Sequence, residues 1–399
     1  MLRQQKYLVF VGFLSGVANG VLWTVFAPYV RLLGLSATIY GVLGGLSVVV
    51  SAFSTLAAGV LSDQIGARKI TSLGYLTASI SFILMYIGSL WSLLVASLIN
   101  GFAGGLHYTG LAVLTSKSTE DKKLHYAFSY VFGFSTLGGA FGSFMGWAPV
   151  IFSNTYGISL LTCYRLFLLT PIPLLLSSSL FVLRTSEEVL KKRYGSARLL
   201  LSEFKHIPNK FLTLVILNSI ISFGAALSIH NIDYYFTAKY GITSGELGSI
   251  FGLQQLFMAL LMLKLPNVAD RIGGPLKTYL LVTSPSIPLL IAMTFVNNYL
   301  VASIIYITRT ILMNIANPLF NAFSMTLIPR ELRGKATSLM SLPLTLAGGI
   351  GRAVGGKLLD IDLELPLRIT AILYATSLTG TAIVFRDYIR KEEIKEKYP

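Results

Sequence analysis

Long apolar segments recur along the whole chain, and they constrain the fold more than any other feature. A helix needs roughly 20 apolar residues to cross the hydrocarbon core of a bilayer, whereas a membrane strand needs only about ten with strict alternation. The length and continuity of these segments predict an all-α membrane protein with twelve transmembrane helices. We place the helices at about residues 7–33, 38–61, 70–90, 92–115, 124–150, 162–183, 211–238, 246–265, 278–296, 299–327, 336–359 and 366–386.

The composition supports this class. Of the 399 residues, 54% are hydrophobic and 12% are charged, whereas a soluble domain typically carries about 25% charged residues. So few charges leave too little polar surface to cover a water-soluble globule of this length. Cys163 is the one cysteine, which excludes an intramolecular disulfide, and we interpret it as a packing residue. The first apolar segment is too long for the core of a signal peptide.

The net charge of +15 is distributed unevenly across the predicted membrane. Most of the 32 Lys and Arg residues lie in connections that the topology places on one side, and only Arg31, Arg165, Lys239 and Arg368 lie on the other. Cytoplasmic loops carry the excess of basic residues, so both termini are predicted to be cytoplasmic, with the plasma membrane as the expected location. This bias explains the positive charge without a nucleic-acid partner.

The longest polar connection divides the chain into two halves. Residues 184–210 carry seven basic and three acidic residues, together with an apolar patch formed by Leu199, Leu200, Leu201 and Phe204. The patch favours an amphipathic helix on the membrane surface, and the alternative is a solvated linker with no further role. The predicted domains are a six-helix bundle at 1–183, a cytoplasmic linker at 184–210, and a second six-helix bundle with a short cytoplasmic tail at 211–399.

The two halves repeat each other. Three pairs of residues share one separation of 207 positions: Gly41 and Gly248, Asp63 and Asp270, and Gly66 and Gly273. Each Asp follows the second span of its half on the cytoplasmic side. Equal topology in both halves predicts a parallel repeat, with a pseudo-two-fold axis along the membrane normal.

Glycine-rich segments in the fifth and eleventh spans are a second similarity between the two halves. Their closely spaced small residues are Gly138, Gly142, Gly351, Gly355 and Gly356. Such spacing lets helix backbones approach closely in lipid. We predict helix packing here, and a gating hinge is the alternative.

These motifs resemble the major facilitator superfamily over nearly the whole chain. The segment after the second span is similar to the family's loop 2–3 signature, which the following residues fit: Gly59, Asp63, Gly66, Arg68 and Lys69. Gln64 and Ala67 stand where the family usually has basic residues. In the second half Asp270, Arg271 and Gly273 fit, while Pro266 replaces the leading Gly. The resemblance implies that Asp63 latches the cytoplasmic side when the outer side is open, and a simple Asp–Gly turn is the alternative.

Two further segments are similar to family signatures. Residues 329–335 resemble loop 10–11, and the glycine segments partly match the fifth-span signature of proton-coupled exporters. Gly139 and Ser143 depart from that signature in the fifth span, and Arg352 departs from it in the eleventh.

The resemblance also implies that the first, fourth, seventh and tenth spans line a central cavity. Polar residues in these spans are Asn19, Asn100, His107, Asn218, His230, Asn231, Asp233, Arg309, Asn314, Asn317 and Asn321. Polar groups at membrane depth usually face a cavity or a partner, because a central charge costs about 2.5–3.5 kcal/mol on insertion scales. From this set we predict a substrate and coupling site formed by Asp233, Arg309, His230, His107, Asn19, Asn314 and Asn317.

Asp233 and Arg309 are the charged members of this set. Their depths in the seventh and tenth spans differ by about 6 Å at 1.5 Å per residue, within reach of long side chains. His230 lies three residues before Asp233, on the same face of a continuous helix. We hypothesise that Asp233 pairs with Arg309 and that a proton or the substrate competes for the pair. The alternatives are a permanent structural ion pair, or an Asp233 in the outer vestibule. For His107 we weigh helix packing against a proton relay.

The sequence lacks the motifs of several enzyme classes. Gly101–Gly105 is not followed by Gly-Lys-Ser/Thr and has no strand–loop–helix context, so an ATPase is disfavoured. We see no metal-ligand cluster and no catalytic triad spacing, and we predict no enzyme activity, no metal and no cofactor.

Three functions stay open at this stage. The leading hypothesis is a monomeric secondary transporter that exports a small, partly lipophilic molecule in exchange for protons by alternating access. The second is an importer or facilitator of a small organic anion or polar metabolite, held by Arg309. The third, of another class, is a transport-dead sensor or a lipid scramblase.

Overall fold

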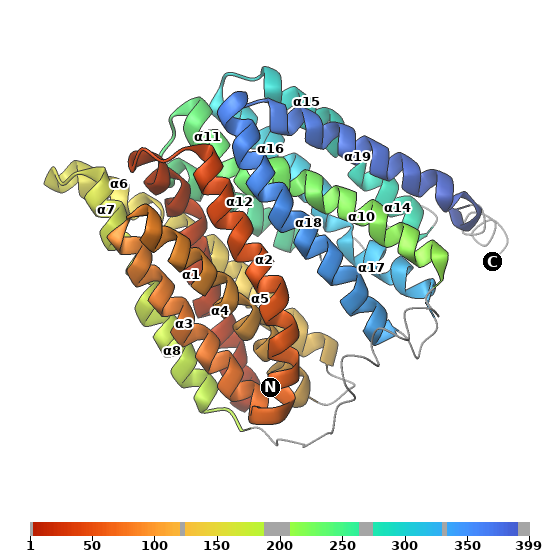
Figure 1. The fold of residues 1–399 in the computed structure, drawn as a ribbon, viewed down its shortest axis with the longest axis horizontal. Coiled ribbons are helices and arrows are strands. Elements are labelled where there is room, and N and C mark those ends of the chain that lie inside the picture. The colour runs from red at the N-terminus through yellow and green to blue at the C-terminus, as the bar shows by residue number, and fades with distance from the viewer. Residues whose placement is uncertain (1–2, 120–123, 187–207, 263–273, 329–332, 390–399) are drawn as a thin grey trace. The chain divides into compact units, whose positions relative to one another are not determined.

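A computed structural model of the chain describes residues 3–119, 124–186, 208–262, 274–328 and 333–389. Every regular element in these ranges is a helix (Figure 1). The chain divides into two compact units, Met1–Arg193 with Ile232–Leu256, and Tyr194–Asn231 with Phe257–Pro399. The segment Ile232–Leu256 therefore packs with the first unit although it follows the central linker. The bundle boundaries at 183 and 211 stay a prediction.

The first unit is a helical bundle in which α1 packs against α5 and α8, and α4 packs against α2 and α3 (Figure 1). Its elements are α1 (Arg3–Leu32), α2 (Ala37–Leu61), η1 (Ser62–Gly66), α3 (Ala67–Ile87), α4 (Leu90–Lys117), α5 (Leu124–Phe144), α6 (Trp147–Tyr156), α7 (Leu160–Phe167), α8 (Pro171–Leu183), α11 (Ile232–Tyr240) and the first part of α12 (Ser244–Met262).

The second unit is built around α10, which packs against both α18 and α19 (Figure 1). Its elements are α10 (Asn209–Ser228), η4 (Ile229–Asn231), α14 (Pro275–Thr283), α15 (Ser286–Phe295), α16 (Tyr299–Ile315), α17 (Asn317–Thr326), α18 (Arg333–Ile361) and α19 (Leu365–Val384). The short 3-10 turn η4 separates α10 from α11, where the sequence predicts one continuous span at 211–238.

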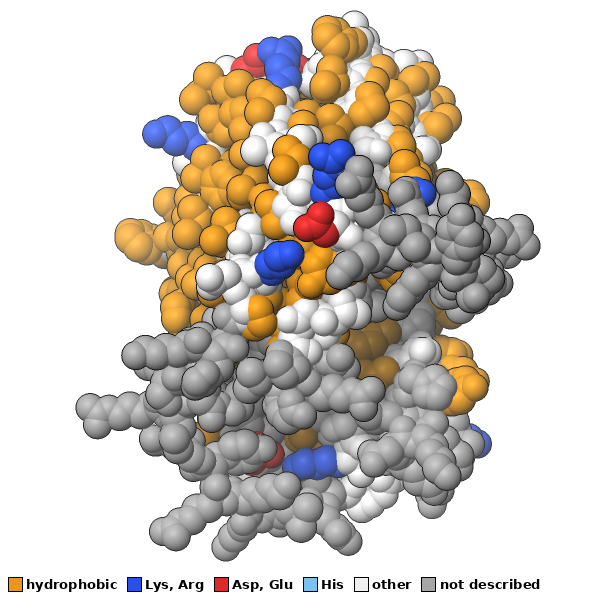
Figure 2. Space-filling model, turned by 90° about the vertical axis from the view of Figure 1, so that its right-hand side faces the viewer, with side chains coloured by type: hydrophobic (Ala, Val, Ile, Leu, Met, Phe, Trp, Pro, Cys, Tyr) orange, Lys and Arg blue, Asp and Glu red, His pale blue; other side chains and the backbone are white. Residues whose placement is uncertain are grey.

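The helices have the length and surface of membrane spans. Eight helical stretches among the described residues are long and apolar enough to cross a bilayer, and one of them, Ala37–Ile87, covers two predicted spans. The helices α5, α12 and α18 overlap the three predicted ranges that remain, and α5 ends six residues before its predicted end at 150. Apolar side chains point outward, with Ile216 63% exposed and Ile383 70% exposed. On the face shown in Figure 2, hydrophobic side chains cover much of the described surface and charged ones are few. The total of twelve spans stays a prediction.

Prolines lie at the breaks that divide two of the predicted spans into shorter helices. Proline has no N–H to donate and fixes its own φ, so it is favoured in the first turn of a helix and kinks or breaks a helix interior. Pro28 and Pro343 nevertheless lie inside α1 and α18. Pro171 occupies the first turn of α8, which follows α7 after a break, and Pro318 occupies the first turn of α17 after α16. The predicted sixth and tenth spans are interrupted at these positions.

Glycines form close seams between the helices of each unit. In the first unit, a Cβ on Gly138 would lie 2.2 Å from the carbonyl oxygen of Phe13, and one on Gly142 would lie 2.1 Å from that of Val17. In the second unit, a Cβ on Gly355 would lie 2.0 Å from the carbonyl oxygen of Leu227. Gly351 approaches Phe223 in the same way, and Gly356 is buried. The seam α1–α5 and the seam α10–α18 thus use the same device, which favours packing over a hinge.

Candidate functional site

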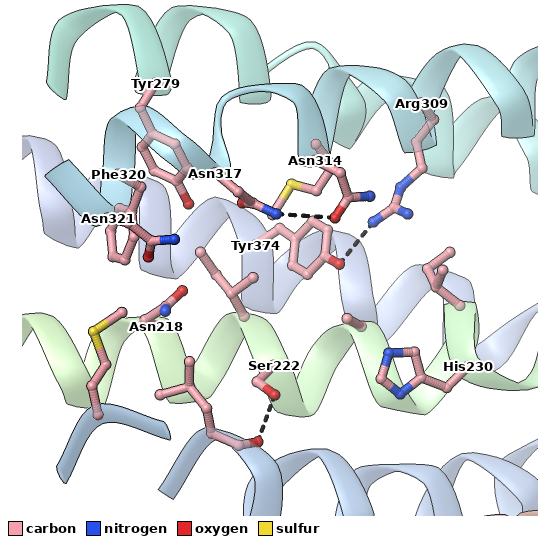
Figure 3. Close-up of a pocket in the computed structure, with 16 residues that line it drawn as sticks. Asn218, Ser222, His230, Tyr279, Arg309, Asn314, Asn317, Phe320, Asn321 and Tyr374 are labelled. Carbon is pink, nitrogen blue, oxygen red and sulfur yellow. Dashed lines mark hydrogen bonds between the residues drawn. The ribbon is translucent and has the colours of Figure 1, made fainter. Parts of the chain in front are cut away.

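A polar cavity lies inside the second unit, with a volume of about 370 Å³. Side chains from α10, η4, α14, α16, α17, α18 and α19 line it (Figure 3). Its polar and aromatic lining residues include Asn218, Ser222, His230, Tyr279, Arg309, Asn314, Asn317, Phe320, Asn321 and Tyr374. None of the residues that the structure assigns to this lining is an Asp or a Glu. The wall therefore combines amide groups, aromatic rings and basic nitrogens.

Arg309 is the charged centre of this wall. Arg309 belongs to α16 and is only 1% exposed. Its Nη2 donates a hydrogen bond of 2.7 Å to the Tyr374 hydroxyl, and its guanidinium carbon lies 5.3 Å from the centre of the Tyr374 ring. The Nε group has no acceptor among the described residues. Figure 3 shows the guanidinium reaching from α16 toward Tyr374.

Asparagine side chains continue the polar wall along the tenth predicted span. Asn314 donates to the Thr310 carbonyl at 2.8 Å, and Asn317 donates to the Asn314 side-chain oxygen at 3.3 Å. Figure 3 shows Asn317 and Asn321 beside the cavity, with Asn218 facing them from α10. The break before Pro318 lets α16 and α17 both present amides to the same space.

The opposite wall is formed by α10, η4 and α18. Ser222 of α10 donates to the Leu344 carbonyl of α18 at 2.7 Å, which fastens these helices beside the cavity. His230 lies in η4 and lines the same space as Arg309. Its neighbour Asn231 is fully buried and donates to the Arg352 carbonyl at 3.0 Å, so η4 is tied to α18.

Asp233, the predicted partner of Arg309, lies in the first unit near the start of α11 and is 1% exposed. The Tyr40 hydroxyl of α2 donates to its carboxylate, and the Tyr234 N–H donates to the other carboxylate oxygen at 2.8 Å. The Tyr40 and Tyr234 rings pack with their centres 5.4 Å apart. Arg309 belongs to the second unit, so the pairing of Asp233 with Arg309 stays a prediction.

His107 and Asn19 lie between helices of the first unit. The Nδ1 atom of His107 is 2.8 Å from the Ala103 carbonyl oxygen, and its ring stacks on that of Tyr75 with centres 4.9 Å apart. Asn19 donates to the Tyr108 hydroxyl at 2.6 Å, joining α1 to α4. The buried, stacked position of His107 supports the packing interpretation over a proton relay.

The loop motif after the second span lies within the described residues in the first half of the chain. Gly66 has a φ of 96°, a conformation that favours glycine, and it directly precedes α3. Asp63 is half-buried in the η1 turn, and Arg68 donates to the Thr185 carbonyl at 3.0 Å. Lys69 is exposed, and Gly59 has open space beside it. Asp270, Arg271 and Gly273 lie outside the described residues.

Three aromatic residues of these sites do not figure in the sequence prediction. Tyr374 of α19 and Tyr279 of α14 line the cavity, and Tyr40 of α2 contacts Asp233. Each lies in a span that the family resemblance does not assign to the cavity. A tyrosine within a predicted apolar span is the one signal that could have marked them, because a buried hydroxyl usually has a hydrogen-bond partner.

Comparison with known proteins gives one family across most of the chain. The family model described as Major Facilitator Superfamily matches residues 8–356. The quinolone resistance protein NorA of Staphylococcus aureus (strain COL) is 24% identical over 414 residues, which cover 100% of both chains.

Solved structures show the same fold. A bacterial homologue of the human lysosomal transporter Spinster, in an inward-facing and occupied conformation, has a TM-score of 0.75 at 14% identity, with 96% of both chains covered. The nucleoside transporter NupG has a TM-score of 0.72 at 14% identity, with 96% of this chain and 99% of that chain covered.

Proposed function

Because the chain belongs to the Major Facilitator Superfamily, we propose that it is a secondary transporter that exports a small, partly lipophilic molecule in exchange for protons. Membership of this family makes it a membrane transporter and not an enzyme. The observation that carries the proposal is the cavity of the second unit, where amides and Arg309 face aromatic rings inside membrane-spanning helices. Such polar groups are costly at membrane depth and are retained where they serve a passage or a partner.

Two observations support export of a partly lipophilic molecule. The relative from Staphylococcus aureus is a quinolone resistance protein, and it covers the whole chain at 24% identity. The cavity wall includes Tyr279, Phe320 and Tyr374, and the rings of Tyr279 and Phe320 lie 4.8 Å apart between centres. Aromatic walls accommodate apolar and planar molecules, while the amides fix their orientation.

The proposed cycle assigns one role to each charged group. Asp233 binds and releases a proton, and its carboxylate alternates between Tyr40 and Arg309. Arg309 binds the substrate. Asp63 and Arg68 close the cytoplasmic side in one conformation through charge-assisted hydrogen bonds. A gradient of protons then drives the solute against its own gradient.

Everted membrane vesicles that contain the protein test the proposal. With an acidic interior, they should accumulate a fluorescent quinolone or another member of a panel of aromatic amphiphiles, and nigericin should abolish the accumulation by collapsing the pH gradient. Asp233→Asn should abolish the gradient-driven part. Ser219→Ala is the matched control, because Ser219 lines an apolar groove rather than the polar cavity. Accumulation that is unchanged by nigericin would contradict proton coupling.

The import of a small organic anion is the other candidate function, and the buried Arg309 favours it. Accumulation in right-side-out vesicles but not in everted ones would decide for import. Arg309→Lys gives a second criterion. If this variant loses all transport while Asp233→Asn is tolerated, Arg309 captures an anion without proton coupling through Asp233, and the reverse pattern indicates proton coupling. Loss of transport in both variants indicates that an anion bound at Arg309 is coupled to the proton on Asp233.

A further inference from the structure

The hydrogen bonds of Arg309 leave part of its guanidinium group without a partner. A guanidinium carries five N–H donors in a fixed planar arrangement. Nη2 donates to the Tyr374 hydroxyl, and Nε has no acceptor among the described residues although the residue is 1% exposed. A buried polar group without a partner is rare in proteins and calls for a ligand, a water or a strained role.

Packing holds this guanidinium in one orientation. The Tyr374 hydroxyl accepts the Nη2 hydrogen bond at 2.7 Å, and its ring centre lies 5.3 Å from the guanidinium carbon, so this side chain holds the Nη2 end of Arg309 in place. A preorganised planar fork of donors matches a carboxylate, which accepts two parallel N–H···O bonds. Lysine would offer a point charge and no such fork.

The rest of the described lining offers no competing anion. It contains Arg309 and His230 but no Asp or Glu. Apolar and aromatic groups, among them Tyr279, Phe320, Met313 and Leu344, form much of the remaining wall. Asn314 and Asn317 add hydrogen-bonding amides near the charged centre (Figure 3). The cavity therefore combines one anion-binding point with a surface suited to a planar apolar body.

We propose that the substrate is a carboxylic acid with an aromatic or similarly planar body, whose carboxylate binds Arg309 at the edge that carries Nε, the N–H group without an acceptor among the described residues. The inference rests on the proposed transport function and specifies the substrate class of the same cavity. The asparagines of α16 and α17 orient polar substituents of the ring, and Tyr374 acts as the positioning residue for Arg309.

A thiol-protection experiment tests this class with three probes on one ring system. The native thiol is removed by Cys163→Ser, and Ala225→Cys introduces a reporter in the cavity wall on α10. In purified protein in lipid nanodiscs, the rate of reaction with N-ethylmaleimide is measured against 2-naphthoate, 2-naphthamide and 2-naphthylmethylammonium. We expect 2-naphthoate to give half-protection at a concentration at least tenfold below that of the other two.

Two variants identify the group that selects the anion. Arg309→Gln should bring the half-protection concentration of 2-naphthoate to that of 2-naphthamide and leave the latter unchanged. Tyr374→Phe keeps the charge of Arg309 but removes the hydroxyl that accepts from Nη2, so it should raise the half-protection concentration of 2-naphthoate severalfold and leave that of 2-naphthamide unchanged. This readout still tests the assignment if Arg309→Gln fails to fold, and an unchanged value for 2-naphthoate would contradict it. Equal protection by 2-naphthoate and 2-naphthamide in the parent protein, or a preference that survives Arg309→Gln, would overturn the proposal.

The outcome is independent of the vesicle experiment. If vesicles accumulate a solute on a pH gradient while the probes protect equally, the carboxylate class is wrong and the transport proposal stands. If the probes show the preference while neither everted nor right-side-out vesicles respond to the gradient, proton-coupled transport is wrong and the anion site stands.

Discussion

An alanine at Gly142 should force apart the two helices that form the centre of the first unit. The added Cβ would lie 2.1 Å from the Val17 carbonyl oxygen. Close C–H···O contacts between helices have C···O distances of about 3.3 Å, so α5 must move away from α1 by about 1.2 Å. Overpacking of this kind costs about 1–3 kcal/mol, which corresponds to a loss of about 2–12 °C in Tm for a unit of this size.

Gly133 provides the matched control on the same helix, because a Cβ there would meet nothing within 4 Å. Gly133→Ala should leave Tm unchanged or raise it slightly, since alanine favours a helix over glycine by about 0.5–1 kcal/mol. The assay is heating of detergent-solubilised protein followed by size-exclusion chromatography. The pair Gly355→Ala and Gly348→Ala repeats the comparison in the second unit, where the nearest contacts are 2.0 Å and 3.4 Å. Equal Tm values for Gly142→Ala and Gly133→Ala would refute the reasoning.

Three further predictions concern other contacts and the topology. His107→Leu removes the stack on Tyr75 and should lower Tm, while the uptake that nigericin abolishes should persist. Loss of that uptake at an unchanged Tm would favour a proton-relay role for His107 over packing. The Thr370 hydroxyl lies 2.7 Å from the carbonyl oxygens of both Gly224 in α10 and Pro366 in its own helix, and it accepts from Ser228 of α10 at 2.9 Å. Thr370→Val should therefore destabilise the α10–α19 contact by about 0.6–1.7 kcal/mol in denaturant titrations, and an unchanged midpoint would contradict this. Ser196→Cys, combined with Cys163→Ser, should react with a membrane-impermeant maleimide in everted vesicles only; labelling of intact cells would reverse the predicted orientation.

Apolar segment length was sufficient to predict where most helices lie, because the bilayer sets a minimum span that hydropathy reports directly. The breaks before Pro171 and Pro318 were missed, since a proline within an apolar run leaves the hydropathy of that run almost unchanged. The 3-10 turn at Ile229–Asn231 carries no proline or glycine and has no local signal in the sequence. The same-face relation predicted for His230 and Asp233 assumed an uninterrupted α-helix there.

Four of the seven residues predicted for the site line the cavity of the second unit, while Asp233, His107 and Asn19 are not among its lining residues. Asn314, Asn317, Arg309 and His230 line one cavity, because polar residues in apolar spans are retained where they avoid lipid. The contact of Arg309 with Tyr374 could not be predicted in this way, because it depends on the rotation of α19 about its axis. Sequence spacing defines which residues share a face, but it does not say which neighbour that face meets.

The placement of Ile232–Leu256 with the first unit has a consequence for any attempt to divide the gene. A fragment that ends at the central linker would lack the segment that supplies Asp233 to Tyr40 and Ser244 to the Gly146 carbonyl. The C-terminal piece would carry this segment without the helices of the first unit against which it packs, and neither piece should be stable alone. Co-expression of the two pieces should restore the stability of both. A stable, monodisperse product from residues 1–210 alone would show that the first unit does not need Ile232–Leu256.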